Sequence, residues 1–159
     1  MNRIKNIIEN KRYIKCIKKN EKKEKNRIYC KHTLEHFVDT ARIAYIINLE
    51  KGLNIDKELI YASALLHDIG KWKQYKNGMP HEIASSVIAK TILMECNFNS
   101  DEILLITEAI DSHRTKVENP FDLKGILALA DKLSRNCFYC KVNDKCNWND
   151  EKKNNSLYF

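Results

Sequence analysis

Glycine and proline, the residues on which tight turns and β-hairpins most depend, are scarce in this chain: four Gly and two Pro occur among 159 residues. Sustained alternation of apolar and polar residues, the pattern of a half-buried strand, is also missing. Hydrophobic residues nevertheless make up 43% of the chain, an ordinary share for a globular protein. The composition therefore favours a helical fold over a sheet.

The chain also lacks long apolar runs and the motifs of several common enzyme classes. No segment approaches the roughly eighteen uncharged apolar residues of a membrane helix, and the N-terminus has no apolar core or cleavage site of a secretory signal. No glycine-rich phosphate loop or G-x-S-x-G nucleophile elbow is present, which argues against nucleotide-binding folds and serine hydrolases. We expect a cytoplasmic protein without a membrane partner, whose six cysteines are thiols or metal ligands rather than disulfides.

The net charge of +7 is concentrated at one end of the chain. Residues 1–27 carry 11 Lys and Arg against 3 Glu, a net +8, so the remaining residues carry −1. Clustered lysines attract phosphate, and this segment could serve as an arm for nucleic acid. Its apolar residues, however, fall on one side of a helical period, which indicates an amphipathic helix with a solvated lysine face. We favour the second interpretation and do not expect nucleic acid as the main partner.

Helical spacing of apolar residues extends over most of the chain and predicts an all-α domain of five to seven helices. Gly70 stands where a C-terminal cap would close the third helix, and a loop through Gly78 and Pro80 follows. The segments are a basic N-terminal helix at 1–27, a main domain at 28–136 and a cysteine-containing tail at 137–159, packed on the same domain, with a short helix near Trp148. The expected helices span residues 1–20, 30–49, 56–69, 81–96, 101–113 and 121–136, with a polar break at 20–26 after the first.

All five histidines of the chain lie at or near the ends of expected helices. His67 and Asp68 are adjacent, and neighbours on a helix project about 100° apart, so partners for a shared ion must come from other elements. A bundle could bring these candidates together: His36, His81, His113 and Asp131. Imidazole with carboxylate suits iron, manganese, zinc or cobalt better than calcium, and a carboxylate between two imidazole-rich sites suits a pair of metals.

Three strings of the sequence carry a resemblance to a known family. They are His36-Phe37-Val38-Asp39-Thr40-Ala41-Arg42-Ile43-Ala44, then Ala64-Leu65-Leu66-His67-Asp68-Ile69-Gly70-Lys71, then Ala130-Asp131-Lys132-Leu133. Their order resembles the H…HD…D signature of HD-domain metal-dependent phosphohydrolases, over about residues 30–136. The resemblance implies a helical bundle that binds one or two divalent metals and hydrolyses phosphate esters, commonly of nucleotides or other small phosphorylated molecules.

The resemblance also implies roles for individual residues. Four match the ligands of a first metal and two more match the extra histidines of the family's binuclear branch: His36, His67, Asp68 and Asp131, then His81 and His113. We expect two metals, with Asp68 bridging them and orienting a water whose pKa the metals lower toward about 7. His32, four residues before His36 on the same helix face, is a second candidate for the upstream ligand. We choose His36, because the residues after it match the family string better.

Basic residues close to the proposed ligands are expected to bind the phosphate of the substrate. Lys71 directly follows the His-Asp motif and is expected to contribute to catalysis as well as to binding. Arg114 and Arg135 lie near proposed ligands and offer the bidentate fork that suits a phosphate.

The tail holds a second cluster of potential ligands, Cys137-x2-Cys140-x5-Cys146. This spacing allows two thiolates from one turn and a third from the next loop to surround a soft metal. A fourth ligand is missing nearby, and Cys30, next to the turn from His32 to His36, is the candidate. We expect a structural zinc ion as the first choice and an iron–sulfur cluster as the second, with free thiols as the alternative.

Two other functions would use the same residues. A metal-containing sensor or nucleic-acid-binding regulator could keep this fold, with the basic helix and the cysteines as its working parts. An HD-type oxygenase with a mixed-valent iron pair would need the same histidines. The complete ligand set favours the hydrolase over the regulator, because a retired active site is expected to have lost ligands.

Overall fold

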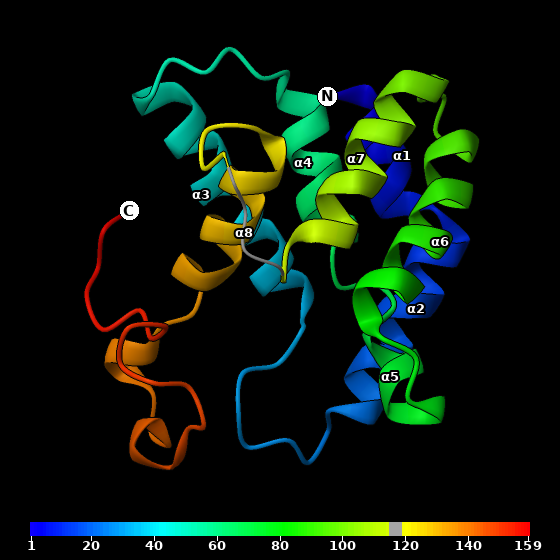
Figure 1. Cartoon of the computed structure of the whole chain (residues 1–159). Coiled ribbons are helices and arrows are strands. Elements are labelled where there is room, and N and C mark those ends of the chain that lie inside the picture. The colour runs from blue at the N-terminus through cyan, green and yellow to red at the C-terminus, as the bar shows by residue number, and fades with distance from the viewer. Residues whose placement is uncertain (115–118) are drawn as a thin grey trace.

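The computed structural model describes residues 1–114 and 119–159, and these ranges form an all-helical fold without a strand, as the sequence predicts (Figure 1). None of the helices in these ranges has both the length and the apolar character needed to cross a membrane. The α-helices are α1 (Asn2–Glu9), α2 (Lys11–Lys23), α3 (Leu34–Glu50), α4 (Lys57–Leu66), α5 (Lys71–Asn77), α6 (His81–Glu95), α7 (Ser100–Ser112) and α8 (Leu123–Leu133), followed by two 3-10 turns, η1 (Cys137–Tyr139) and η2 (Asn143–Lys145).

The described ranges hold eight α-helices, where the sequence predicted five to seven. The N-terminal segment divides at Asn10, whose backbone is extended and whose side chain accepts hydrogen bonds from the N–H groups of Arg12 and Tyr13. This is an N-terminal cap, so a new helix begins there. The other additional helix is α5, which occupies part of the stretch that was expected to be a loop.

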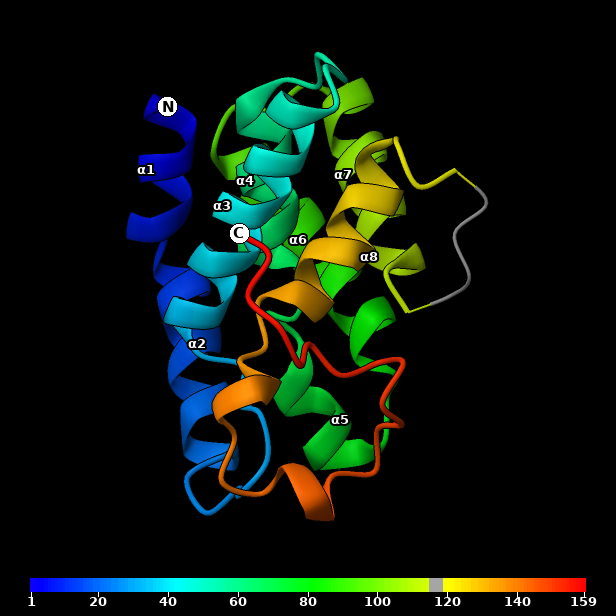
Figure 2. The ribbon, with the colours of Figure 1, turned by 90° about the vertical axis from the view of Figure 1, so that its left-hand side faces the viewer.

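Helix α4 lies at the centre of the bundle and contributes to two apolar cores. Leu65 and Leu66 pack with residues of α1, α2, α6 and α7, whereas Ile60 and Ala64 pack with residues of α3, α7 and α8. Figure 2 shows α1 and α2 one above the other along one side of the bundle. Burial of each large apolar side chain contributes about 1.5–3 kcal/mol, so α4 and the turn that follows it are firmly held.

The turn after α4 differs from the expected C-terminal cap at Gly70. The helix ends at Leu66, and Gly70 has φ −92° and ψ 2°, outside the left-handed region, where it precedes α5 as its N-terminal cap. The reason for glycine here is space: a Cβ atom would lie 2.5 Å from the backbone nitrogen of Ser85 and 2.6 Å from the carbonyl carbon of Ala84. Gly70 therefore allows the turn that carries the His-Asp motif to lie directly on α6.

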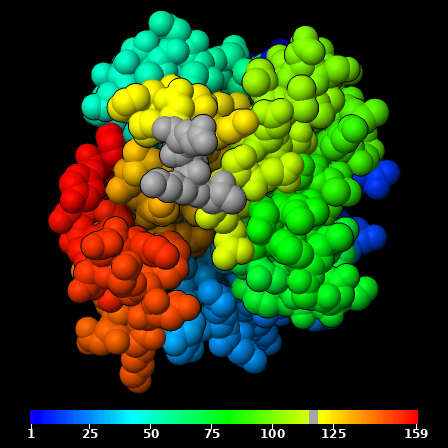
Figure 3. All heavy atoms as spheres, viewed as in Figure 1, coloured from blue at the N-terminus to red at the C-terminus, as the bar shows by residue number. Residues whose placement is uncertain are grey.

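The tail is tied to the end of α8 by a side-chain hydrogen bond and to itself by a backbone one. The Asn154 side chain donates to the carbonyl oxygen of Leu133, and the Phe138 N–H donates to the carbonyl oxygen of Asn154. The short helix expected near Trp148 is not formed; the 3-10 turns η1 and η2 lie earlier in the tail. In Figure 3 the tail, orange to red, lies against the blue segment that precedes α3.

Candidate metal centre

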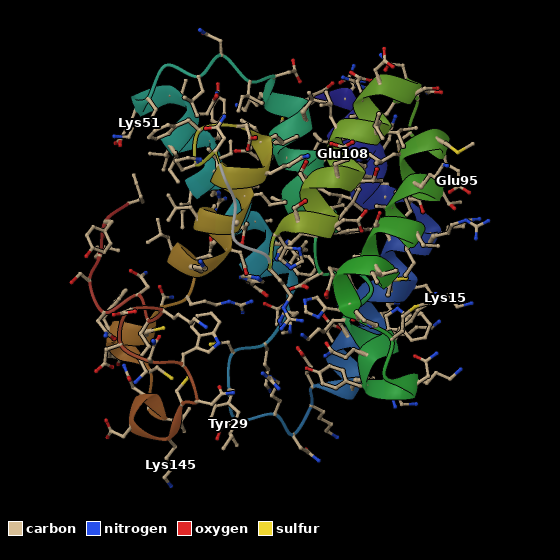
Figure 4. The ribbon with its side chains drawn as sticks, in the orientation of Figure 1. Lys15, Tyr29, Lys51, Glu95, Glu108 and Lys145 are labelled. Atoms are coloured by element: carbon tan, nitrogen blue, oxygen red, sulfur yellow. The ribbon has the colours of Figure 1, made fainter. Side chains whose placement is uncertain are left out.

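The six residues that the sequence predicted as metal ligands come together where several helices begin or end. Five of them are buried, and Asp131 is partly buried. Figure 4 shows side-chain nitrogen atoms gathered in the middle of the molecule, beyond the end of α7. The six are His36 in the first turn of α3, His67 and Asp68 directly after α4, His81 at the start of α6, His113 directly after α7, and Asp131 in α8.

The potential ligand atoms form two groups that share one residue, Asp68. In each group one nitrogen or oxygen atom of every member lies within 4.8 Å of the others. His32 belongs to neither group, so the geometry favours His36 for the upstream position. The first group is His36, His67, Asp68 and Asp131, and the second is Asp68, His81 and His113.

The two carboxylate oxygens of Asp68 face different groups. Oδ2 lies 3.4 Å from Nε2 of His67, whereas Oδ1 lies 3.0 Å from Nε2 of His81 and 3.8 Å from Nε2 of His113. Asp131 completes the first group, with Oδ1 3.5 Å from Nε2 of His67. A carboxylate placed in this way can contact two cations at once, one through each oxygen.

His67 and His113 are oriented by the helices that they end. Each donates its Nδ1–H to the carbonyl oxygen three residues earlier, at 2.7 Å to Ala64 and 2.6 Å to Ile110. These carbonyls lie in the last turn of a helix, where carbonyl oxygens have no partner within the helix. The bond leaves Nε2 as the ring nitrogen that faces the centre and that, in the neutral ring, carries the lone pair a metal requires.

His36 and His81 are oriented by side chains instead. Nδ1 of His36 lies 3.0 Å from Oγ of Ser134, and Nδ1 of His81 lies 2.8 Å from Oε1 of Gln74. In both residues Nε2 again faces a carboxylate of the centre. Nε2 of His36 lies 3.2 Å from Oδ1 of Asp131, and Nε2 of His81 faces Oδ1 of Asp68. Neither Ser134 nor Gln74 was predicted from the sequence, because a single Ser or Gln carries no motif.

His32 has the same orientation although it lies outside both groups. Its Nδ1 is 2.6 Å from Oε1 of Glu24, and its Nε2 is 3.3 Å from Oδ2 of Asp68. Tyr75 donates a hydrogen bond to the same Glu24 oxygen at 2.6 Å. Burial would raise the pKa of Glu24, but its bonds with His32 outweigh this and lower it to about 2. The stretch expected to be a polar break therefore includes a buried carboxylate that holds a histidine against the centre.

The charges of the centre favour a bound cation. Burial alone would raise the pKa of Asp68 and of Asp131, yet the neighbouring histidines hold both well below the ordinary value. Burial also opposes the charged form of His67, but Asp68 and Asp131 outweigh it and raise its pKa to about 10. Two buried carboxylates thus remain ionised beside a protonated His67, and a cation bound at Nε2 would take the place of that proton.

The donor atoms also fit divalent transition metals. Nε2 of His67 and Oδ1 of Asp68 are buried without a hydrogen bond, although other atoms of their groups lie within 4 Å. An unpaired buried polar atom costs about 1–3 kcal/mol, which a cation bound between these atoms would remove. Imidazole nitrogen and carboxylate oxygen together are ligands for iron, manganese, zinc and cobalt.

The three basic residues expected to bind phosphate line a cavity of about 210 Å³ that opens onto the centre. Nη2 of Arg135 lies 2.8 Å from Nε2 of His36 and 3.3 Å from Oδ1 of Asp131. Nζ of Lys71 lies 3.1 Å from Nδ1 of His81, and burial lowers the pKa of this lysine. Arg114 is more exposed and lies 3.5 Å from a carboxylate oxygen of Glu82.

The four cysteines predicted to form a second site line the same cavity: Cys30, Cys137, Cys140 and Cys146. None of them is in a disulfide. Among residues 1–114 and 119–159, the two groups of ligand atoms within 4.8 Å of one another are those that share Asp68, and neither includes a cysteine.

Asn20 connects the N-terminal helices to the His-Asp turn. Its side chain donates to the carbonyl oxygen of Asp68 at 3.0 Å and accepts from the N–H of Trp72 at 2.8 Å, and it is fully buried. Asn20→Ala is expected to lower the free energy of unfolding by about 1–3 kcal/mol, because it leaves both backbone groups buried without a partner. Urea denaturation measures this, with the exposed Asn6→Ala in α1 as the control, for which no change is expected. Equal stability of the two variants would contradict the prediction.

Comparisons with known proteins agree with this geometry. The family model for the HD domain matches residues 33–136. The chain is 50% identical to an uncharacterized protein of Clostridium beijerinckii over the full length of both chains. It is 30% identical to ribonuclease Y of Mycoplasma mycoides and 32% identical to ribonuclease Y of Petrotoga mobilis, in each case over 67% of this chain and 19% of the relative. No solved structure gives a significant match. The chain therefore belongs to the HD-domain family.

Proposed function

We propose that this protein is an HD-type phosphohydrolase that uses divalent metals to hydrolyse a phosphate ester of a nucleotide or another small phosphorylated molecule. The observation that carries the proposal is the position of Asp68, whose two oxygens face two separate sets of histidines. A bridging carboxylate between two imidazole-rich sites is the arrangement of a two-metal hydrolase.

In this proposal the first group of residues holds one metal and the second group holds the other, with Asp68 common to both. Metals bound there would lower the pKa of a coordinated water toward about 7 and so supply hydroxide at neutral pH. The chain itself holds the ligands in place, through Ala64 and Ile110 for two histidines and through Ser134 and Gln74 for two others. The rings therefore need no reorientation to bind, although Arg135 has to move away from Nε2 of His36.

The basic residues of the cavity bind and orient the phosphate. The guanidinium of Arg135 and the ammonium of Lys71 stand on two sides of the centre, next to His36 and His81. Both can donate to phosphate oxygens, and Arg135 can do so with two parallel bonds. Lys71 also offsets negative charge that develops on the phosphate during the reaction. Arg114, half exposed at the rim, contributes to binding alone.

The size of the cavity and the similarity to known proteins bear on the substrate. A volume of about 210 Å³ accommodates the phosphate and the groups next to it. The ribonuclease Y relatives make RNA phosphodiesters a class to be tested, although this chain spans 19% of those proteins. The complete donor set favours a hydrolase over a regulator that keeps the fold without activity.

The direct test is a screen for phosphate release with protein loaded with iron or manganese. The substrates are nucleoside mono-, di- and triphosphates, dinucleoside polyphosphates and short oligoribonucleotides. Turnover of at least one class, lost when the metals are chelated and restored when they return, is expected. Fully loaded protein that hydrolyses none of them would favour the regulatory function or, if it consumes oxygen with an organic substrate, the oxygenase.

The number of metals gives an independent test of the two-site arrangement. His81→Ala removes a ligand of the second group alone, so the manganese content of manganese-loaded protein is expected to fall from two ions per chain to about one. Elemental analysis measures this, and Thr91→Ala, an exposed change in the same helix, is the control that retains both ions. Two tightly bound ions in His81→Ala would contradict the assignment.

A further inference from the structure

Four cysteines face one space although they come from opposite ends of the chain. Cys30 lies in the segment before α3, and the other three lie in the tail, yet all four line the cavity next to the metal centre. A hydrogen bond from Tyr29 Oη to the carbonyl oxygen of Lys145, at 3.2 Å, joins the two segments. The two segments that carry the cysteines are therefore held together by the fold itself, through a contact that does not involve a cysteine.

Short turns hold the three tail cysteines toward the cavity. Cys137 begins η1 and Cys140 directly follows it, with the N–H of Cys140 donating to the carbonyl oxygen of Cys137. Asn143 donates from its side chain to the same carbonyl at 2.7 Å, and Cys146 directly follows the next turn, η2. The tail is thus a compact loop with a cysteine at each of its bends.

The spacing of the sulfur atoms distinguishes two kinds of site. Around one zinc ion the Zn–S distance of about 2.3 Å places the sulfurs roughly 3.8 Å apart. No three potential ligand atoms that include a cysteine lie within 4.8 Å of one another in the described ranges. In a cubane iron–sulfur cluster each cysteine binds a different iron, so the sulfurs stand farther apart. Among any three of the four sulfurs, at least two thus stand more than 4.8 Å apart, which is farther than around one zinc ion and compatible with the cluster.

The charges around the cysteines also suit a bound cluster. Arg27, Arg135 and Lys153 line the same cavity and offset the negative charge of coordinated thiolates. Arg27 and Arg135 also donate to the carbonyl oxygens of Cys30 and Lys31, which holds them close.

We propose that Cys30, Cys137, Cys140 and Cys146 bind a [4Fe–4S] cluster, separate from the metals of the HD centre. Cys30 stands two residues before His32, and Cys137 stands two residues after Arg135. A cluster bound to Cys30 therefore holds the chain next to His32, which faces Asp68. The same cluster bound to Cys137 holds the chain next to Arg135, which faces His36. Its binding orders one wall of the cavity.

The test is the content of iron and acid-labile sulfide in the full chain, purified without oxygen or reconstituted with ferrous iron and sulfide. The HD centre binds metal without sulfide, so sulfide reports on the cysteines alone. About four sulfides per chain are expected, with a visible absorption that bleaches on reduction. Cys140→Ser and Cys146→Ser are each expected to lose most of the sulfide, whereas the control Cys96→Ala, at a buried cysteine outside the cluster, retains it.

His36→Ala separates this proposal from the proposed function. It is expected to lose metal from the HD centre and to keep its sulfide, so the two sites fail independently. One zinc ion per chain that disappears in Cys140→Ser, with no sulfide in the wild type, would overturn the cluster. Absence of both sulfide and zinc after reconstitution would overturn a metal site at these cysteines altogether.

Discussion

Asp68→Ala is expected to lower the turnover of a phosphate ester by about a thousandfold or more while the protein remains folded. Asp68 is the one residue common to both ligand groups, so the substitution removes an anionic ligand from each. Both the affinity for metal and the orientation of the nucleophile depend on it. Steady-state kinetics with saturating metal measure the loss, and elemental analysis measures the weaker binding.

The fold is expected to tolerate this change. Asp68 follows α4, whose position depends on Ile60, Leu65 and Leu66, and its backbone carbonyl still accepts the bond from Asn20. Circular dichroism checks the helical content. Asp101→Ala, which removes an exposed carboxylate from the first turn of α7, is the matched control and is expected to leave turnover unchanged. An Asp68→Ala variant with full activity would refute the proposed mechanism.

Gly70→Ala is expected to lower the free energy of unfolding by about 3 kcal/mol, the upper part of the usual range for overpacking. The added methyl group would lie 2.5 Å from the backbone nitrogen of Ser85, and a backbone atom cannot move aside as a side chain can. The hydrogen bond from the Gly70 N–H to Ser85 Oγ, 2.9 Å long, would be strained as well. Because the turn carries Asp68 and α6 carries His81, binding of metal is expected to weaken with stability.

Gly52→Ala is the control for the effect of a methyl group alone. Gly52 has φ +60° and no atom within 4 Å of the added carbon, so only the backbone conformation opposes alanine there. That cost is about 1 kcal/mol, without an effect on metal. Thermal and urea denaturation compare the two variants. A Gly70→Ala variant no less stable than Gly52→Ala would show that the turn and α6 separate easily.

The helical fold and the residues that meet at the centre could be predicted because their signals are local in the sequence. Apolar residues at helical spacing predict most of the helices, and His67-Asp68 with its neighbours forms a recognisable string. Helix α5 was missed because its sequence, Lys71–Asn77, is polar and followed by Gly78 and Pro80. The helix packs on α2 and α6, and Trp72 packs against the core that includes Leu65 and Leu66, so its contacts come from distant parts of the chain.

The residues that support the centre could not be predicted, because their role depends on partners distant in the chain. Asn20 and Glu24 stand in a run of lysines and glutamates and have no local feature that marks them as buried. Their burial follows from contacts with Asp68 and His32, 48 and 8 residues away. Both lie before residue 33, where the match to the HD family begins. The part of the chain needed to orient the centre is thus longer than the part that defines the family.

The gathering of all five histidines at one site has a consequence for spectroscopy. Protein labelled with nitrogen-15 in histidine alone would give ring signals from the centre and from no other part of the molecule. Every one of those rings has its Nδ1 in a hydrogen bond, so the tautomer of each could be followed separately while metal is added. The order in which His36 and His81 respond would then give the order in which the two groups fill.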